Sequence, residues 1–430
     1  MLRLAYQLLL WVAVVPVLVF LALRARRQGD APGRWAERLG WIPRPKAPVS
    51  VWLHAASLGE VVAAKPLIDA LVERHGAEGI WITTMTTSGS QAVRRMWGDA
   101  IGHSYLPFDL ERPLGRFLRR VQPQRCIVLE TEIWPNCYDL LARYRIPLLI
   151  ANARLSPRSA TGYRRVRGAI ARVLAKVTIV AAQSEADAER FRALGAPTVV
   201  TAGNIKFDLS APEAQIEQGW RWRQACGERP VWVAASTHDG EEAAVLAAHR
   251  DLLRWYPEAL LVLVPRHPQR FETVARSLGR DGWSFTRRSA HGETVEVHCE
   301  QPILLGDSTG EMFAYLAMAD TAFVGGSLVE IGGHNILEPA ALGLPVLFGP
   351  HMFHFVDARR LLLDAGGAQE IASAQDLAVA VAAFFARPAR RHEVGQAAAN
   401  AVAANRGAVA RYLELLDELR AAWPPEAGGS

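Results

Sequence analysis

The stretch of sequence that decides the fold is Ala322-Phe-Val-Gly-Gly-Ser-Leu-Val-Glu-Ile-Gly-Gly-His-Asn-Ile-Leu-Glu-Pro-Ala-Ala-Leu-Gly-Leu-Pro-Val-Leu-Phe-Gly-Pro350. An apolar run at residues 321–324 predicts a buried strand. A glycine-rich loop follows. A short helix is expected to begin at Asn335, because Asn is a favoured N-cap and Glu338 then occupies the third helical position. Residues 344–348 predict the next strand. The order strand, loop, helix, strand is typical of a parallel α/β sheet.

The loop in this stretch has the composition of an anion-binding site. Gly325, Gly326 and Ser327 present backbone N–H groups beside a helix N-terminus, where an anionic group such as a phosphate is stabilised. Glycines also let a ligand approach the backbone closely. The alternative is structural: Glu338 closes a capping box with Asn335, and the glycines only turn the chain.

The rest of the chain repeats this alternation of strands and helices. Further strands are expected at residues 49–53, 80–84, 103–106, 125–129, 148–151, 177–181, 199–202, 231–234, 259–264 and 303–305. Such alternation predicts parallel sheets covered on both faces, and 430 residues exceed the usual size of one domain. We therefore predict an α/β fold that resembles a GT-B glycosyltransferase, with two Rossmann-like domains facing a cleft and an N-terminal membrane-anchor helix. The predicted parts are an anchor (residues 1–27), an acceptor-binding domain (48–210), a nucleotide-sugar-binding domain (228–405) and a C-terminal helix (406–424).

The composition is that of a globular protein, with half of the residues hydrophobic and 21% charged. The net charge of +5 suits an acidic ligand or an anionic membrane surface. The arginines are scattered and no DNA- or RNA-binding signature occurs, so nucleic acid is not expected as a partner. The four cysteines include no Cys-x-x-Cys pair, and we interpret them as reduced and structural, in a cytosolic environment.

The N-terminus predicts attachment to a membrane. Residues 4–23 carry no charge and are long enough to span a bilayer as a helix. Arg24, Arg26 and Arg27 follow, against Arg3 on the other side, which places the following domains in the cytoplasm by the positive-inside rule. Two alternatives remain open, a cleaved signal peptide and a helix lying in the membrane surface.

In the first half, carboxylates follow two of the predicted strands. Glu60 follows the strand at 49–53, and Glu130 and Glu132 follow the strand at 125–129. Open α/β sheets keep their chemistry at the carboxyl ends of strands. For Glu60 the alternative is a capping box with Ser57. For Glu130 and Glu132 the alternative is that one of them caps the helix after Pro135.

A basic cluster, Tyr163-Arg-Arg-Val-Arg167, also lies in the first half. We interpret it as a contact for acceptor phosphates near a membrane. The alternative is a solvated helix face.

In the second half, four successive strand ends carry polar or glycine-rich loops, which parallel strands bring to one edge. These loops contain Ser236-Thr237-His238, Arg266-His267, Thr309-Gly310-Glu311 and the Gly325 loop. No Asp-x-Asp occurs in the chain, so no metal bridge to a diphosphate is expected. Backbone amides and Arg266 are expected to hold the phosphate instead.

Taken in order, these motifs resemble the Kdo transferases, the 3-deoxy-D-manno-octulosonic acid transferases of lipopolysaccharide synthesis. The resemblance covers nearly the whole chain. The matching pieces are the hydrophobic N-terminus, His54-Ala-Ala-Ser-Leu-Gly-Glu60, Glu130-Thr-Glu-Ile-Trp-Pro135, Gly203-Asn-Ile-Lys-Phe-Asp208, Ala235-Ser-Thr-His238, Val264-Pro-Arg-His-Pro268, Gly306-Asp-Ser-Thr-Gly-Glu311 and Gly325-Gly-Ser327 through Gly333-His-Asn-Ile-Leu-Glu-Pro339.

The resemblance implies an inverting transfer of Kdo from CMP-Kdo to the lipid A precursor, lipid IVA, on the cytoplasmic side of the inner membrane, with no metal or other cofactor. It implies that Glu60 is the general base, which takes a proton from the attacking sugar hydroxyl. The implied donor-binding residues are Arg266, His267, Thr309, Gly310, Glu311, Gly325, Gly326, Ser327, Asn335, Ile336, Leu337 and Glu338. Other implied substrate contacts are Ser57, Gly59, Glu130, Glu132, Lys206, Ser236 and Thr237.

Two other functions remain open. One is a GT-B enzyme that uses a UDP-sugar, which preferential binding of CMP over UDP would exclude. The other is a membrane-tethered binding protein with a degenerate nucleotide site, which would bind nucleotide without turnover. Against the second, Glu60, Arg266 and Glu338 are all present, and a protein that only binds has no need of a base.

Overall fold

The computed structural model describes residues 34–209, 211–291 and 300–421. The predicted membrane anchor, residues 1–27, lies outside these ranges. Within them, no helix is both long enough and apolar enough to cross a membrane. The chain divides into two units, one that runs to Asp208 and resumes at Arg406, and one at Leu209–Asn405.

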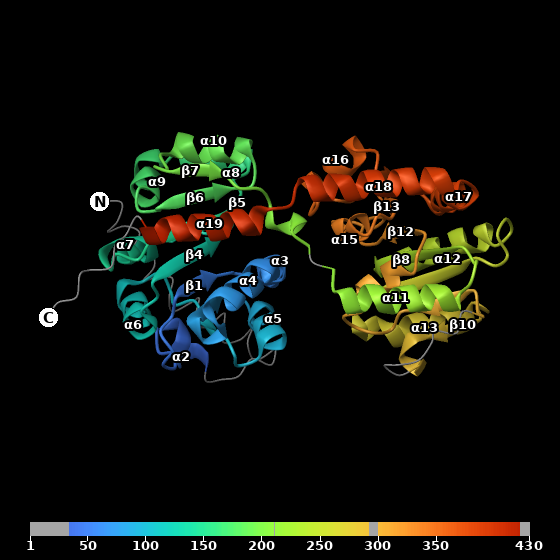
Figure 1. Ribbon diagram of the computed structural model, residues 1–430, viewed down its shortest axis with the longest axis horizontal. Helices are drawn as coiled ribbons and strands as arrows, with labels where there is room; N and C mark the ends of the chain where they lie inside the picture. Colours follow the sequence, from blue (N-terminus) through green and yellow to red (C-terminus); the bar gives the residue numbers. More distant parts are fainter. Residues whose placement is uncertain (1–33, 210, 292–299, 422–430) are drawn as a thin grey trace. The chain divides into compact units, whose positions relative to one another are not determined.

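The first unit is a parallel seven-stranded sheet between helices (Figure 1). Its strands are β1 (Val51–His54), β2 (Ile80–Thr84), β3 (Gly102–Tyr105), β4 (Arg125–Leu129), β5 (Leu148–Ala153), β6 (Ile179–Ala182) and β7 (Val199–Thr201). Its helices are α2 (Trp35–Arg38), α3 (Leu58–Ala63), α4 (Lys65–His75), η2 (Ala77–Gly79), α5 (Thr87–Trp97), α6 (Glu111–Val121), α7 (Pro135–Arg143), α8 (Pro157–Arg164), α9 (Arg167–Leu174), α10 (Glu185–Leu194), η3 (Ile205–Phe207) and α19 (Ala408–Ala421).

Side-chain alternation along each strand builds two cores, one on each face of this sheet. Val51 and Leu53 of β1 pack into the core that contains α4 and α19, whereas Trp52 packs into the core that contains α6, α7 and α10. All four residues of β1 are buried. Burial on both faces explains why the run of residues 51–53 is continuously apolar.

The second unit has the same plan, with sheet order β10-β11-β9-β8-β12-β13-β14, all parallel. Its strands are β8 (Val231–Thr237), β9 (Leu260–Pro265), β10 (Phe285–Arg287), β11 (Ile303–Leu305), β12 (Thr321–Val324), β13 (Val346–Phe348) and β14 (Ala368–Glu370). Its helices are α11 (Glu213–Ala225), α12 (Glu241–Leu252), η4 (Pro268–Arg270), α13 (Phe271–Arg280), η5 (Arg288–His291), α14 (Met312–Ala317), α15 (Leu337–Ala341), α16 (Val356–Asp364), α17 (Ala374–Ala386) and α18 (Pro388–Ala404). The sequence did not predict β10 and β14, because each is a three-residue edge strand with no fully buried residue.

The C-terminal helix of the chain belongs to the first unit. The C-terminal helix predicted at residues 406–424 is observed as α19, and it is separated from α18 by a turn in which Gly407 has φ +108°. The Tyr412 hydroxyl donates to Gly203 O (2.8 Å) and accepts from Asn152 N (3.1 Å). Leu415, Leu416 and Tyr412 are buried in the core beside α4.

We expect Leu416→Ala to destabilise the first unit by about 2–5 kcal/mol, because it removes fully buried methyl groups and leaves a cavity. Asp417→Ala is the matched control on the same helix, since it breaks only the exposed pair with Arg74 (2.9 Å) and is expected to cost less than about 1 kcal/mol. Urea unfolding, with hydrogen exchange of the amides in the first sheet as the probe, measures the loss of stability in both variants. Equal effects would show that α19 is not part of this core.

The prediction of reduced cysteines is correct for two of them. Cys126 and Cys137 are free and buried. Cys226, in contrast, is disulfide-bonded. The spacing of cysteines in sequence does not reveal which of them the fold brings together, which explains the error.

Candidate active site

Glu60 lies at the point where the strand order of the first sheet reverses. In the order β3-β2-β1-β4-β5-β6-β7, β2 and β3 are added on one side of β1, and β4 to β7 are added on the other side. The strand order therefore reverses between β1 and β4, and open α/β sheets bind ligands at such points. Glu60 follows β1 in the first turn of α3. Its Oε2 accepts from Ala56 N (2.7 Å) and its Oε1 from Ser57 Oγ (2.9 Å), while Glu60 N donates to Ser57 Oγ (3.4 Å).

The capping-box alternative for Glu60 is therefore present in the structure, and it is compatible with a catalytic role. The pKa of Glu60 is raised to about 7, first because burial disfavours the charged form and also because the Glu130 and Glu132 carboxylates repel it. The hydrogen bonds from Ala56 and Ser57 act in the opposite direction. A carboxylate with a pKa near neutrality has the proton affinity of a general base.

Glu130 and Glu132 follow β4, on the other side of the reversal point, and neither caps α7. The N-terminus of α7 is capped by Asp109, whose carboxylate accepts from Asn136 N (3.1 Å) and Cys137 N (2.8 Å). Glu130 has φ +58°, a conformation that is strained for a residue other than glycine. Burial raises the pKa of Glu132, and the Glu130 carboxylate raises it further. The structural alternative for this pair is thus removed.

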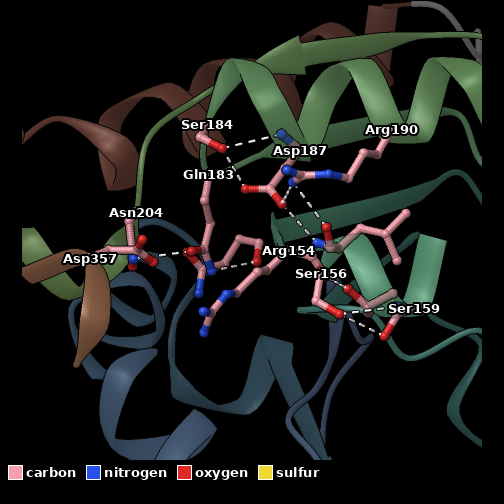
Figure 2. Close-up of polar contacts among 12 residues, drawn as sticks. Arg154, Ser156, Ser159, Gln183, Ser184, Asp187, Arg190, Asn204 and Asp357 are labelled. Atoms are coloured by element: carbon pink, nitrogen blue, oxygen red, sulfur yellow. Dashed lines mark hydrogen bonds and ion pairs between the residues drawn. The ribbon is translucent and has the colours of Figure 1, made fainter. Parts of the chain in front are cut away.

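The loops after β5, β6 and β7 are tied together at the same edge of the sheet (Figure 2). Asn204 Nδ2 donates to Gln183 Oε1 (3.1 Å), and Gln183 Nε2 donates to Asn152 O (3.0 Å). Asn152 has φ +55° at a break in the β5–β6 register. Lys206 belongs to this group, whereas β5 and β6 separate β7 from β4 and the Glu60 reversal point. Lys206 therefore follows the edge strand β7 of this sheet, whereas Glu60 follows the central strand β1.

Arg154 is a residue at this edge that the sequence prediction left out. It lies exposed directly after β5. The loop that carries it is fixed by buried Asp187, which accepts from Leu155 N (2.9 Å) and Arg190 Nη1 (3.0 Å). The signal in the sequence was the Asn152-Ala-Arg154 strand end, which has the same position after its strand as Glu130 has after β4.

The basic cluster of Tyr163–Arg167 lies beside Glu132. The Glu132 carboxylate contributes to a raised pKa of Tyr163, for which burial is the larger cause. Arg164, Arg165 and Arg167 are exposed, and no salt bridge is formed by these three within the part of the chain that the structure describes. The cluster is a solvated helix surface, and it adjoins the strand end that carries Glu132.

The second sheet reverses its strand order between β8 and β12. Ser236, at the end of β8, has φ +58° at a break in the β8–β9 register. A bulge of this kind is common next to active sites. Thr237 is fully buried and its hydroxyl donates to Glu242 Oε1 (3.0 Å), so its role is structural. The next strand end carries Arg266 and His267, both exposed.

Three histidines cluster at this reversal point, and only His267 was predicted as a site residue. His238 Nε2 and His334 Nε2 are 2.7 Å apart, and their rings stack at 4.9 Å with an interplanar angle of 9°. His267 packs edge-on against His238 at 5.2 Å. The pKa of His334 is lowered to about 3 by burial and then by the charge of Arg266. Within the described ranges, no group of His, Cys, Asp or Glu residues is arranged to hold a metal ion.

The glycine loop after β12 does not offer its amides to a ligand, contrary to the prediction for Gly325, Gly326 and Ser327. The buried carboxylate of Glu241 accepts from Gly326 N (2.7 Å), Ser327 N (3.0 Å) and Leu328 N (2.9 Å). Gly325 N donates to Ala235 O (2.8 Å). The Ser327 hydroxyl is fully buried and accepts from Gly349 N (2.9 Å). The loop is an anion nest, as its composition predicted, but the protein supplies the anion.

Asn335 and Glu338 do lie together at the site. Asn335 Nδ2 donates to Glu338 Oε1 (3.1 Å), and Asn335 Oδ1 accepts from Leu337 N (3.2 Å). Burial raises the pKa of Glu338, while Asn335 and the charge of Arg266 lower it. The helix begins at Leu337, one residue later than a cap at Asn335 implies, and Ile336 is the N-cap. Ile336 and Leu337 are buried, so their side chains belong to the core.

The loop after β11 is partly engaged as well. Glu311 Oε1 accepts from Arg288 Nη2 (2.8 Å) and Gln218 Nε2 (3.2 Å), so this carboxylate takes part in an internal ion pair. Thr309 and Gly310 are exposed. In the first unit, Gly59 has no positive φ and no close neighbour that requires glycine, and it leaves the surface open next to Glu60.

Comparison with known proteins agrees with this arrangement of motifs. A family model described as 3-Deoxy-D-manno-octulosonic-acid transferase (kdotransferase) matches residues 33–209. A solved glycosyltransferase from Rickettsia africae is similar in fold, with a TM-score of 0.55 and 12% identity, covering 86% of this chain and 98% of that one.

Two relatives match over nearly their whole length. The 3-deoxy-D-manno-octulosonic acid transferase of Haemophilus influenzae is 40% identical, covering 96% of this chain and 98% of that protein. The protein of the same name from Bordetella pertussis is 38% identical, covering 92% and 94%. The chain therefore belongs to the 3-deoxy-D-manno-octulosonic acid (Kdo) transferase family and is an enzyme of the glycosyltransferase class.

Proposed function

We propose that this enzyme transfers Kdo from CMP-Kdo to lipid IVA by a single inverting displacement, with Glu60 as the general base. The observation that carries the proposal is the environment of Glu60. Its carboxylate lies at the reversal point of the first sheet, is fixed by two hydrogen bonds and has a pKa of about 7. A sugar hydroxyl is a weak nucleophile, and loss of its proton to such a carboxylate accompanies its attack on C2 of Kdo.

The donor is held, in this proposal, by the cationic edge of the second sheet. The C2–O bond to CMP breaks as the new bond forms, and negative charge accumulates on the departing phosphate. Arg266 and His267 are exposed there, and Arg266 donates planar, charge-assisted hydrogen bonds suited to phosphate. Oε1 of Glu338 accepts from Asn335, and Oε2, which has no hydrogen bond to the described residues, accepts from ribose hydroxyls in this proposal.

The acceptor and the membrane are assigned to the first unit. Lipid IVA carries phosphates, and the exposed arginines of the Tyr163–Arg167 cluster adjoin Glu132. We propose that residues 1–27 anchor the enzyme to the inner membrane with its catalytic units on the cytoplasmic side. We also propose that transfer requires no metal, since side-chain cations supply the positive charge. Activity is then expected to survive EDTA.

The pH dependence of transfer tests the role of Glu60. The base must be ionised, so kcat/KM is expected to rise with pH through about 7, the pKa of Glu60, and to level off above it. Glu130→Gln removes a negative charge that raises this pKa, and its profile is expected to shift to lower pH. Initial rates of Kdo transfer between pH 5 and 9 measure both effects. A flat profile, or an identical midpoint in Glu130→Gln, would contradict the proposal.

A further inference from the structure

The buried carboxylate of Glu241 connects two neighbouring strand ends of the second sheet, those of β8 and β12. We call this edge of the second sheet, where the donor is proposed to bind, the donor edge. Glu241 is the first residue of α12 and has no exposed surface. Oε2 accepts from His238 N (2.9 Å), after β8, and from Gly326 N (2.7 Å), after β12. Oε1 accepts from Ser327 N (3.0 Å) and Leu328 N (2.9 Å). Four main-chain donors therefore converge on one carboxylate.

No cation pairs with this carboxylate in the described parts of the chain. The nearby guanidinium, that of Arg270, bonds Glu242 and Asp239 instead. The charge of Glu241 is thus balanced by backbone dipoles alone, which is the geometry by which glycine loops bind a phosphate. Gly325 is required beside it, because a Cβ there would lie 2.9 Å from Glu241 Oε2 and 2.7 Å from Ser236 O.

The loop held by Glu241 carries residues of the donor edge. Gly326 O accepts from Gly333 N (2.7 Å), one residue before His334. His334 stacks on His238, and Glu241 holds the backbone of His238 directly. A Cβ on Gly326 would lie 2.9 Å from His334 Cδ2, so the loop and the imidazole are in close contact. The position of both imidazoles therefore depends on the carboxylate.

We propose that Glu241 is a built-in anion that replaces a ligand phosphate in the glycine loop and positions His238 and His334 for donor binding. The amides after β12 are not a ligand site in this enzyme. The donor's phosphate is left to the cationic side chains, because a buried negative charge repels it from the loop. The role of His238 and His334 in donor binding rests on the proposed function. The occupation of the glycine loop by the Glu241 carboxylate does not.

Chemical rescue tests the nest itself. Glu241→Ala exposes four unpaired donors around a small cavity, and we expect sodium formate to raise its melting temperature more than sodium chloride at equal ionic strength. Glu241→Gln fills the cavity but turns an NH2 group toward two of the donors, so it is expected to be destabilised without a formate effect. Val245→Ala, a buried apolar truncation on the same helix, is the control for cavity formation and is also expected to show no rescue.

Nucleotide binding tests the positioning role. Glu241→Ala is expected to bind CMP about tenfold more weakly or worse, since the amides that position His238 and His334 lose their partner, and formate is expected to restore the affinity. Loss of stability with no formate effect on either melting or CMP affinity would overturn the proposal. If wild type fails to bind CMP while formate still stabilises Glu241→Ala, the nest stands and the proposed function fails.

Hydrogen exchange on the wild-type enzyme tests the proposal without requiring that a Glu241 variant folds. The amides of Gly326, Ser327 and Leu328 are expected to exchange slowly without nucleotide and to be unchanged by CMP. Fast exchange that CMP then slows would show that these amides bind the donor, and would overturn the proposal.

Discussion

Glu60→Gln is expected to lower the rate of Kdo transfer by about a hundredfold to ten-thousandfold, the usual contribution of a general base. The amide has nearly the same shape and still accepts from Ala56 N, but it has no basic oxygen to take the acceptor's proton. CMP affinity is expected to stay unchanged, because Glu60 lies in the first unit and the donor edge in the second. Single-turnover transfer and calorimetry with CMP measure the two quantities.

The same substitution has an expected effect on stability with a defined sign. The folded pKa of Glu60 is about 7, above its ordinary value of 4.5, so the folded state binds more protons than the unfolded state between these values. Ionisation of Glu60 therefore destabilises the fold as pH rises through that window. Glu60→Gln is expected to melt no lower than wild type at pH 8. Retained transfer in a folded Glu60→Gln enzyme would return Glu60 to a capping role.

Arg266→Ala is expected to weaken CMP binding by about ten- to hundredfold, the value of one or two charge-assisted hydrogen bonds. Arg266 is exposed, and its charge acts on both His334 and Glu338, so it lies where a phosphate next to the ribose would be neutralised. Arg266→Lys is expected to recover only part of the affinity, since an ammonium lacks the planar pair of donors.

Arg254→Ala is the control for loss of a surface arginine, because the exposed Arg254 pairs with Asp251 and with no other residue of the described ranges. It is expected to leave CMP affinity unchanged. Isothermal titration with CMP and UDP compares the variants and also tests the nucleotide preference. Equal CMP affinity in Arg266→Ala and wild type would remove Arg266 from the donor site.

The layout of this fold was predictable because its strands are buried on both faces. The strands β2 and β4 are buried along their whole length and are mostly apolar, and their predicted bounds equal the observed ones. The polar residues that follow each strand mark the functional edge without any knowledge of the fold. Ser57 and Glu60 have the spacing of a capping box, and the structure shows that box together with a perturbed carboxylate.

Partnership between distant side chains was not predictable. The amides of Gly326 and Ser327 have the sequence pattern of a phosphate site, yet Glu241, 85 residues away from Gly326, fills it. Likewise, Asp109 rather than Glu130 or Glu132 caps α7, across 27 residues of chain. Local spacing shows what kind of group a loop is able to bind. Only the tertiary fold shows which group of the protein already occupies the loop. The edge strands β10 and β14 were missed because they bury too little to leave an apolar signature.

The most direct test of the proposed reaction is incubation of the full-length enzyme with CMP-Kdo and lipid IVA, followed by mass spectrometry of the lipid. The expected result is lipid IVA carrying one or more Kdo residues, with release of CMP and with no product when a UDP-sugar replaces CMP-Kdo. A folded enzyme that binds CMP but leaves lipid IVA unmodified, or that transfers from a UDP-sugar instead, would contradict the proposed function.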